Sequence, residues 1–196
     1  MTLVDTSLWA NHFRATQPAL VRLLNDGLAG VHPFVVGELA AGNPKNRAAL
    51  GNATTLTECL GAHLARIQTG DYCGILAYVE RNKLHGDVLR DIRVMIRDHK
   101  RVATCLGFGP RFLHSTGQAY KGGPNTGVFL QITCDDANDL PVPDQAYTFG
   151  VVKAAQARGD FEVLAERGRR VLRVHLGGHV SAGLTALKEA VRQALG

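Results

Sequence analysis

The feature that most constrains the fold of this chain is an alternation, from Leu56 onward, between short apolar runs and longer amphipathic segments. The apolar runs predict strands over 72–79, 101–108, 127–134 and 169–177. A helical interpretation of the first of these runs stays open. The amphipathic segments predict helices over 56–70, 87–100, 148–168 and 181–196. Strands that alternate with helices favour the α/β class, with a mostly parallel sheet flanked by helices.

Composition places the chain among ordinary folded proteins. It has 196 residues, 45% of them hydrophobic, which suits one domain or slightly more. No apolar run is long enough to cross a membrane, and the N-terminus has no basic leader or cleavable apolar region, so a cytoplasmic location is expected. The four cysteines form no CxxC pair, which favours reduced, buried thiols over a zinc site or disulfides.

The charge balance is basic, with a formal net charge of +5 and a pI near 9.2. A phosphorylated metabolite suits this balance, and so does nucleic acid, although no long basic tract requires it. Six arginines and histidines fall within 154–177. The favoured interpretation of this segment is a solvated helix face followed by an edge strand protected by charge.

A glycine-rich stretch, "HSTGQAYKGGPNTG" over 114–127, has the composition of a loop that wraps an anion. It does not match the P-loop, because Gly122 follows Lys121 where a serine or threonine is required. The nearby "GFGPRF" fails the dinucleotide fingerprint at Phe112. A nest of backbone N–H groups, with Lys121 or Arg111 as counter-charge, is one interpretation. A structural loop whose glycines adopt positive φ is the other, and the residues do not decide between them.

Two acidic residues mark the first fifty residues. Asp5 ends a predicted strand and Glu38 begins a predicted helix, so the two carboxylates could meet and hold Mg²⁺ or Mn²⁺. The alternative is two unrelated acids, one of which offsets a helix dipole.

The first segment resembles the N-terminal part of VapC-type PIN-domain ribonucleases. The resemblance rests on "MTLVDTSLWANHFR" and "HPFVVGELAAGNPKNRAAL". It implies that Asp5 and Glu38 are two metal-binding acids of a ribonuclease site. The family has further aspartates in its second half, and no matching motif follows Leu50.

The remainder resembles the C-terminal region of bifunctional transaldolase/glucose-6-phosphate isomerases. The resemblance rests mainly on "RVATCLGFGPRFLHSTGQAYKGGPNTGVFLQIT" and "YTFGVVKAAQARGDFEVLAERGRRVLRVHLG". It implies glucose 6-phosphate/fructose 6-phosphate isomerisation and transfer of a dihydroxyacetone unit through a lysine Schiff base.

The Schiff-base lysine and most of the isomerase domains are expected upstream of this region, so the catalytic residues stay unassigned. "PDQAYTFGVVK" echoes the isomerase lysine motif loosely, and the role is not carried over to Lys153. The resemblance implies phosphate contacts from Ser115, Thr116, Lys121, Gly122 and Gly123.

The two resemblances divide the chain into a partial PIN-like segment, 1–50, and an α/β unit, 53–196, around a proline- and glycine-containing seam over 43–55. The first hypothesis is a fragment or fusion related to the sugar isomerases, which contacts a phosphosugar, needs no cofactor and has weak or no activity alone. The second is a VapC-like ribonuclease relic that uses Mg²⁺ or Mn²⁺ and binds RNA. The third is a non-catalytic module that docks on an isomerase chain or on a second copy. None of the three involves a membrane.

Overall fold

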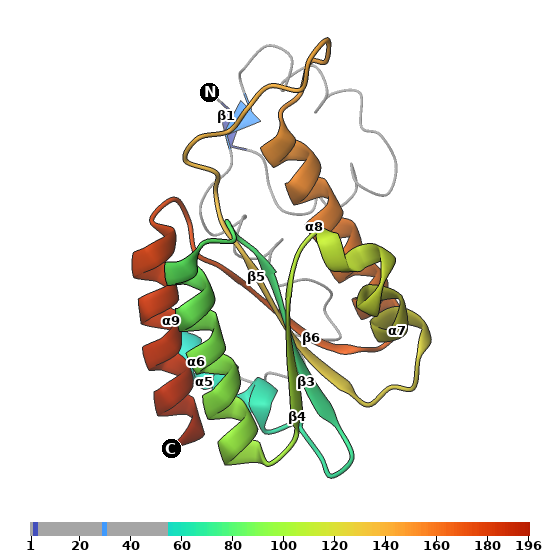
Figure 1. The fold of residues 1–196 in the computed structure, drawn as a ribbon, viewed down its shortest axis with the longest axis vertical. Coiled ribbons are helices and arrows are strands. Elements are labelled where there is room, and N and C mark those ends of the chain that lie inside the picture. The colour runs from blue at the N-terminus through green and yellow to red at the C-terminus, as the bar shows by residue number, and fades with distance from the viewer. Residues whose placement is uncertain (1, 4–28, 31–54) are drawn as a thin grey trace. The chain divides into compact units, whose positions relative to one another are not determined.

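The computed structural model of the chain describes residues 2–3, 29–30 and 55–196 (Figure 1). The chain divides into two compact units, Met1–Gly42 and Asn43–Gly196. In the first unit, β1 (Thr2–Leu3) pairs in parallel with β2 (Ala29–Gly30). Asp5 and Glu38 lie outside the described residues.

The second unit is built on a four-stranded parallel sheet, as the alternation of strands and helices predicts. Its strands are β3 (Tyr72–Tyr78), β4 (Ala103–Phe108), β5 (Gly127–Thr133) and β6 (Arg170–His175). Their order in the sheet is β4-β3-β5-β6, and every neighbouring pair is parallel. The four apolar runs are therefore all strands, including the one for which a helix stayed open.

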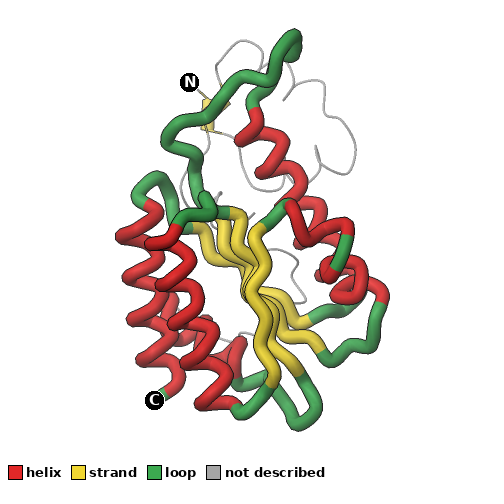
Figure 2. The backbone as a smooth tube through the Cα atoms, in the orientation of Figure 1, coloured by secondary structure: helices red, strands yellow, loops and turns green. Residues whose placement is uncertain are grey.

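Helices cover both faces of this sheet, as Figure 2 shows. One face carries α5 (Leu56–Leu64), α6 (Lys83–Lys100) and α9 (Val180–Leu195), and the other carries α7 (Thr116–Gly122) and α8 (Phe149–Glu166). A capping box between Thr55 and Glu58 begins α5, and Arg101 in the left-handed region ends α6. The helix α5 ends at Leu64, earlier than the end at residue 70 that the sequence predicts for this helix.

The two faces of the sheet differ in chemistry. Towards α5, α6 and α9, the strands present mostly apolar side chains, namely Cys73, Ile75, Ala77, Leu130, Ile132, Leu172 and Val174, with Val79 just after β3. The polar exceptions are Thr104, which accepts from Arg93 of α6, and Arg170, which pairs with Asp71. Leu89, Ile92 and Ile96 of α6 are fully buried against the apolar side chains. Each such side chain stabilises the fold by roughly 1.5–3 kcal/mol. The α8 face also has an aromatic core, but polar side chains follow it towards the carboxyl end of the strands.

No helix among the described residues is long and apolar enough to cross a membrane. The four cysteines are free thiols, and Cys73 is buried.

Candidate functional site

The glycine-rich stretch is not the loop that its composition predicts. It begins within a short 3-10 helix, η1 (Arg111–His114), and continues as α7 before turning into β5. Tyr120 of α7 is only 7% exposed and its ring lies 5.1 Å from that of Phe129. This aromatic packing stabilises a helix that two glycines would otherwise disfavour.

The glycines of this stretch serve close packing. The described glycines with positive φ are Gly70, Gly168, Gly177 and Gly196, so none belongs to the stretch. A Cβ on Gly123 would lie 2.6 Å from the Ala119 carbonyl oxygen, and one on Gly117 would lie 2.9 Å from the Phe112 carbonyl oxygen. None of these glycines adopts the positive φ of a turn or of a left-handed nest. An anion contact by this stretch stays a prediction.

The predicted phosphate contacts lie at two ends of α7. Ser115 and Thr116 are at its beginning, and Lys121 to Gly123 are at its end, roughly 9 Å away along the helix axis. The Lys121 ammonium already donates to Asp160 of α8 at 3.0 Å. The structure therefore does not bring the five residues into one cradle.

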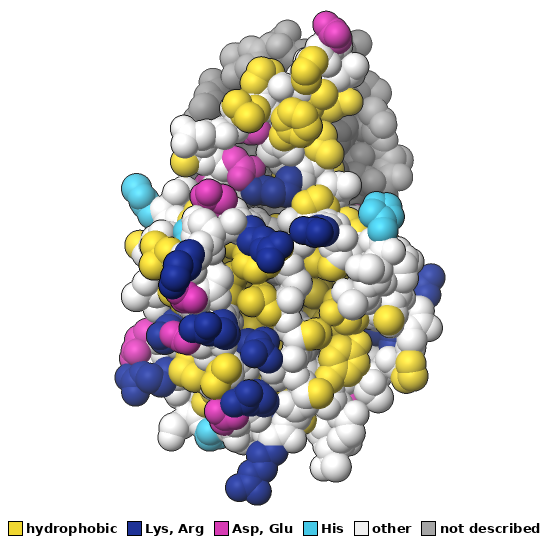
Figure 3. All heavy atoms as spheres, in the orientation of Figure 1, with side chains coloured by type: hydrophobic (Ala, Val, Ile, Leu, Met, Phe, Trp, Pro, Cys, Tyr) yellow, Lys and Arg dark blue, Asp and Glu magenta, His cyan; other side chains and the backbone are white. Residues whose placement is uncertain are grey.

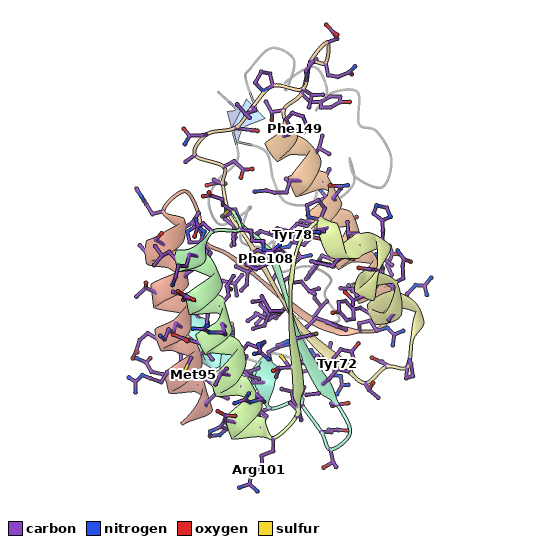
Figure 4. All side chains as sticks on the ribbon, viewed as in Figure 1. Tyr72, Tyr78, Met95, Arg101, Phe108 and Phe149 are labelled. Atoms are coloured by element: carbon purple, nitrogen blue, oxygen red, sulfur yellow. The ribbon has the colours of Figure 1, made fainter. Side chains whose placement is uncertain are left out.

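Polar side chains instead gather between the sheet and α8. Strand register places Tyr78, Thr133 and His175 side by side, and places Gln131 beside Arg173 one row earlier. Side-chain alternation directs both rows towards α8. We call the set the α8-face polar cluster: Tyr78, Lys121, Gln131, Thr133, Asp160, Arg173 and His175. Figure 4 shows Tyr78 at one end of β3, opposite Tyr72.

Asp160 is the buried carboxylate of the α8-face polar cluster, and its side chain is 2% exposed. It accepts hydrogen bonds from Lys121 Nζ at 3.0 Å and from Tyr78 Oη at 3.4 Å. Burial raises the pKa of Asp160, although Lys121 opposes the change. Burial also raises the pKa of Tyr78 well above its ordinary value, so Tyr78 keeps its proton.

Arg173 supplies a second cation. Its Nε donates to Gln131 Oε1 at 2.6 Å, its NH2 donates to the Ala157 carbonyl at 2.9 Å, and it lies 4.7 Å over the ring of Phe161. Burial lowers its pKa to about 10, which leaves it charged at neutral pH. Lys121 and Arg173 thus outnumber Asp160 in the buried part of the α8-face polar cluster, which favours an anion there, whereas Asp135 beside His175 adds a negative charge at its exposed end.

This result corrects part of the interpretation of 154–177. β6 is an edge strand, as expected. Two of the arginines in and beside it are not solvated, however, because Arg169 is 8% exposed and Arg173 is packed under α8. Elsewhere the basic side chains over α6 are interspersed with acidic ones, and Lys83–Asp87 and Lys188–Asp91 form ion pairs (Figure 3).

The carboxyl ends of β3 and β5 form the topological switch of the sheet. From β3 the chain passes to β4 on one side, and β5 returns on the other side. Open α/β sheets bind ligands at such points. At this edge His175 contacts Thr133 and Asp135, and Lys153 forms an ion pair with Asp136. The sequence signal for this edge is a polar residue at or just after the end of three of the four apolar runs, namely Glu80, Asp135 and His175.

Comparison with known proteins adds two findings. The chain is 55% identical over 47 residues to ribonuclease VapC32 from two strains of Mycobacterium tuberculosis. This match covers 24% of the chain and 38% of VapC32, so the chain spans well under half of that relative. A search of protein-family models finds no match.

The fold also resembles a solved structure. The crystal structure of hypothetical protein TT0462 from Thermus thermophilus aligns with a TM-score of 0.59 at 15% identity, over 98% of this chain and 55% of that one. At this identity the likeness concerns the fold alone, and it agrees with the α/β architecture. The resemblance to transaldolase/glucose-6-phosphate isomerases stays a prediction.

Proposed function

We propose that the first segment of the chain derives from a VapC-type ribonuclease and takes part in metal-dependent cleavage of RNA. The observation that carries this proposal is the 55% identity to VapC32 over 47 residues, a length close to that of the predicted segment. Asp5 and Glu38 would hold Mg²⁺ or Mn²⁺, an ion that proteins often bind with one or two carboxylates plus substrate phosphate oxygens. The metal would stabilise the negative charge that develops on the RNA phosphate.

Residues 2–3, 29–30 and 55–196 contain no group of three or more histidine, cysteine, aspartate or glutamate side chains that could hold an ion. The proposal therefore depends on the two acids of the first segment, together with RNA and water.

Cleavage of RNA by the purified full-length chain, with Mg²⁺ or Mn²⁺ added, tests the proposal. Asp5→Asn and Glu38→Gln should each lower the rate by about a hundredfold or more, because each removes a metal-binding carboxylate. Asp26→Asn, an acid between the two stretches that carry the resemblance, is the matched control and should cleave at the wild-type rate. Cleavage that persists in Asp5→Asn, or no cleavage with either metal, would contradict the proposal.

A second candidate function concerns residues 55–196, namely binding of a phosphorylated sugar without turnover. The α8-face polar cluster favours it, because its cations outnumber its carboxylate and it lies beside the switch point of the sheet. Ser115 and Thr116 follow β4 and η1 and belong to the same end of the sheet. The paired Lys121 would contribute charge through space rather than direct contact.

An NMR titration with fructose 6-phosphate tests this second candidate. Amide and side-chain signals of Thr133, Arg173 and His175 should shift at millimolar ligand, whereas fructose without phosphate should leave them unchanged. Arg173→Met should weaken binding about tenfold or more, because it removes a charge-assisted contact. Arg192→Met, on the opposite helical layer, is the control. Shifts confined to Gly122 and Gly123, or none at all, would reject the α8-face polar cluster as the binding site.

A further inference from the structure

Three side chains at the carboxyl end of β5 and β6 form a connected chain of hydroxyl, imidazole and carboxylate. Thr133 Oγ1 lies 3.0 Å from His175 Nδ1, and His175 Nε2 lies 3.2 Å from Asp135 Oδ1. Neither of the functions proposed above assigns a chemical role to this contact. It is defined by side-chain geometry and not by a sequence motif.

The nearby carboxylate favours one tautomer of His175. Asp135 Oδ1 lies 3.2 Å from His175 Nε2 as an ion-pair contact, and its negative charge favours the tautomer with the proton on Nε2. In that tautomer Nδ1 has the free lone pair and accepts the hydroxyl proton of Thr133 across the 3.0 Å contact. This is the orientation in which a histidine acts as a general base towards a hydroxyl nucleophile, with a third group holding the ring.

The sheet fixes the backbone of Thr133 and His175, and one backbone hydrogen bond ties Asp135, which follows β5, to the segment after β6. Thr133 and His175 are direct partners in the β5–β6 register. The Leu176 amide donates to the Thr133 carbonyl at 2.9 Å, and the Asp135 amide donates to the Gly177 carbonyl at 3.2 Å. Thr133 is β-branched, which restricts its side-chain rotation. The hydroxyl and the imidazole are therefore held by rigid elements rather than by a loose surface loop.

A second hydroxyl–imidazole contact provides an internal comparison. His85 Nε2 lies 3.2 Å from Ser181 Oγ, but His85 Nδ1 faces the Glu80 carbonyl oxygen and the Asn82 amide. No carboxylate completes that set, and His85 is 5% exposed. His175, with a side chain that is 32% exposed, is more open to a substrate and has its acid partner.

We propose that Thr133 is a nucleophile for acyl transfer, with His175 as its general base and Asp135 as the residue that orients the imidazole. The Thr133 oxygen forms a bond to the carbonyl carbon of an activated ester while its proton passes to His175 Nδ1. The ester bond to the leaving alcohol breaks, and His175 returns the proton to that alcohol. Water then hydrolyses the acyl-threonine by the same route and releases the carboxylic acid. Arg173, one row below on β6, adds a positive charge on the same face of the sheet.

A fluorophosphonate reporter, which reacts with activated hydroxyl groups and releases fluoride, tests the proposal on the full-length chain. Peptide mapping should place the label on Thr133. Labelling should be lost in Thr133→Val and His175→Gln and kept in Thr133→Ser, which retains the hydroxyl. Ser181→Ala, which removes the hydroxyl of the comparison pair, should label like the wild type.

Hydrolysis of p-nitrophenyl acetate supplies the rate. His175→Gln should lower it by about 10²–10⁴-fold, the usual contribution of general-base catalysis, and Asp135→Asn should lower it less. Circular dichroism identifies any variant that does not fold, and Thr133→Ser then decides the role of the hydroxyl. An unlabelled wild-type chain, a label at another residue, or undiminished labelling of folded His175→Gln would overturn the proposal.

Discussion

Gly122 and Gly123 are adjacent in the chain but have different surroundings. A Cβ on Gly123 would lie 2.6 Å from a backbone oxygen, whereas one on Gly122 would meet nothing within 4 Å. Gly123→Ala should therefore lower the free energy of unfolding by about 1–3 kcal/mol, because backbone must move to accommodate the methyl group. Gly122→Ala, in the last turn of α7, should be neutral or stabilising by up to about 1 kcal/mol.

Urea unfolding of the two glycine variants provides the measurement. Equal midpoints for the two variants would contradict a packing role for Gly123. A loss of ligand shifts in Gly122→Ala, with unchanged stability, would instead indicate that this end of α7 contacts a ligand.

Asp71 and Arg170 form a bidentate ion pair that is largely shielded from solvent. Two hydrogen bonds of 2.6 and 2.8 Å join them, and their side chains are 8% and 15% exposed. The hydrogen bonds from Arg170 lower the pKa of Asp71. Because the folded-state pKa lies below the unfolded-state value, the pair stabilises the fold above the ordinary aspartate pKa. That contribution is lost as the pH falls through the lowered value.

Asp71→Asn should accordingly be less stable than the wild type by about 2 kcal/mol at neutral pH. The difference should shrink as the pH is lowered from about 5 towards 2. Chemical denaturation across this range measures it. Asp87→Asn, which breaks the exposed pair with Lys83, is the control and should change stability little. A difference between wild type and Asp71→Asn that is independent of pH would contradict the assignment.

At the scale of elements, the strands could be predicted because each is an apolar run bounded by turn residues. The helix α7 could not, because the glycines of its segment are typical of a loop, and the stabilising contacts of Tyr120 come from distant aromatic rings. Tertiary packing here overrides local propensity.

The candidate site could be predicted only in part, because its residues are brought together by packing between segments that are distant in the sequence. The resemblance to sugar isomerases predicts phosphate contacts from both Ser115 and Lys121, but α7 separates these two residues. The α8-face polar cluster draws its members from three strands and two helices, and register alone aligns Tyr78, Thr133 and His175. The register between neighbouring parallel strands is set by how the strands pack across the sheet. The local residue pattern of one segment does not reveal it.

Arg169 stabilises the end of α7 from outside that helix. Its guanidinium NH2 donates to the carbonyl oxygens of Lys121 at 2.7 Å and Gly123 at 2.6 Å. Arg169→Met should leave these carbonyls without that donor and speed amide hydrogen exchange over 116–123 by about tenfold, corresponding to roughly 1.4 kcal/mol. The exposed Arg167, which donates to Lys121 at 3.3 Å, gives the control Arg167→Met, for which exchange should change less. Exchange that is equal in the wild type and Arg169→Met would refute the capping role.

At the scale of the whole molecule, the chain combines two units to which different proposed functions belong. Unit Asn43–Gly196 contains the parallel sheet and both apolar clusters on its faces. The identity to VapC32 extends over 24% of the chain, while the polar cluster and the Thr133–His175–Asp135 contact all lie within 55–196. The two proposed functions are thus separable by truncation.

A chain that begins at Asn43 should unfold cooperatively with nearly the same urea midpoint as the full chain, because it keeps the four-stranded sheet and the described helices α5 to α9 that pack on it. Removal of α9 is the control. That helix buries Leu184, Leu187 and Val191 completely, and its loss should abolish cooperative unfolding, since exposing each side chain costs roughly 1.5–3 kcal/mol.

The Asn43 chain should lose RNA cleavage and keep both fluorophosphonate labelling and phosphosugar-induced shifts. If cleavage survived in it, the ribonuclease function would not belong to Asp5 and Glu38; if cooperative unfolding disappeared, the first segment would be part of the folded unit.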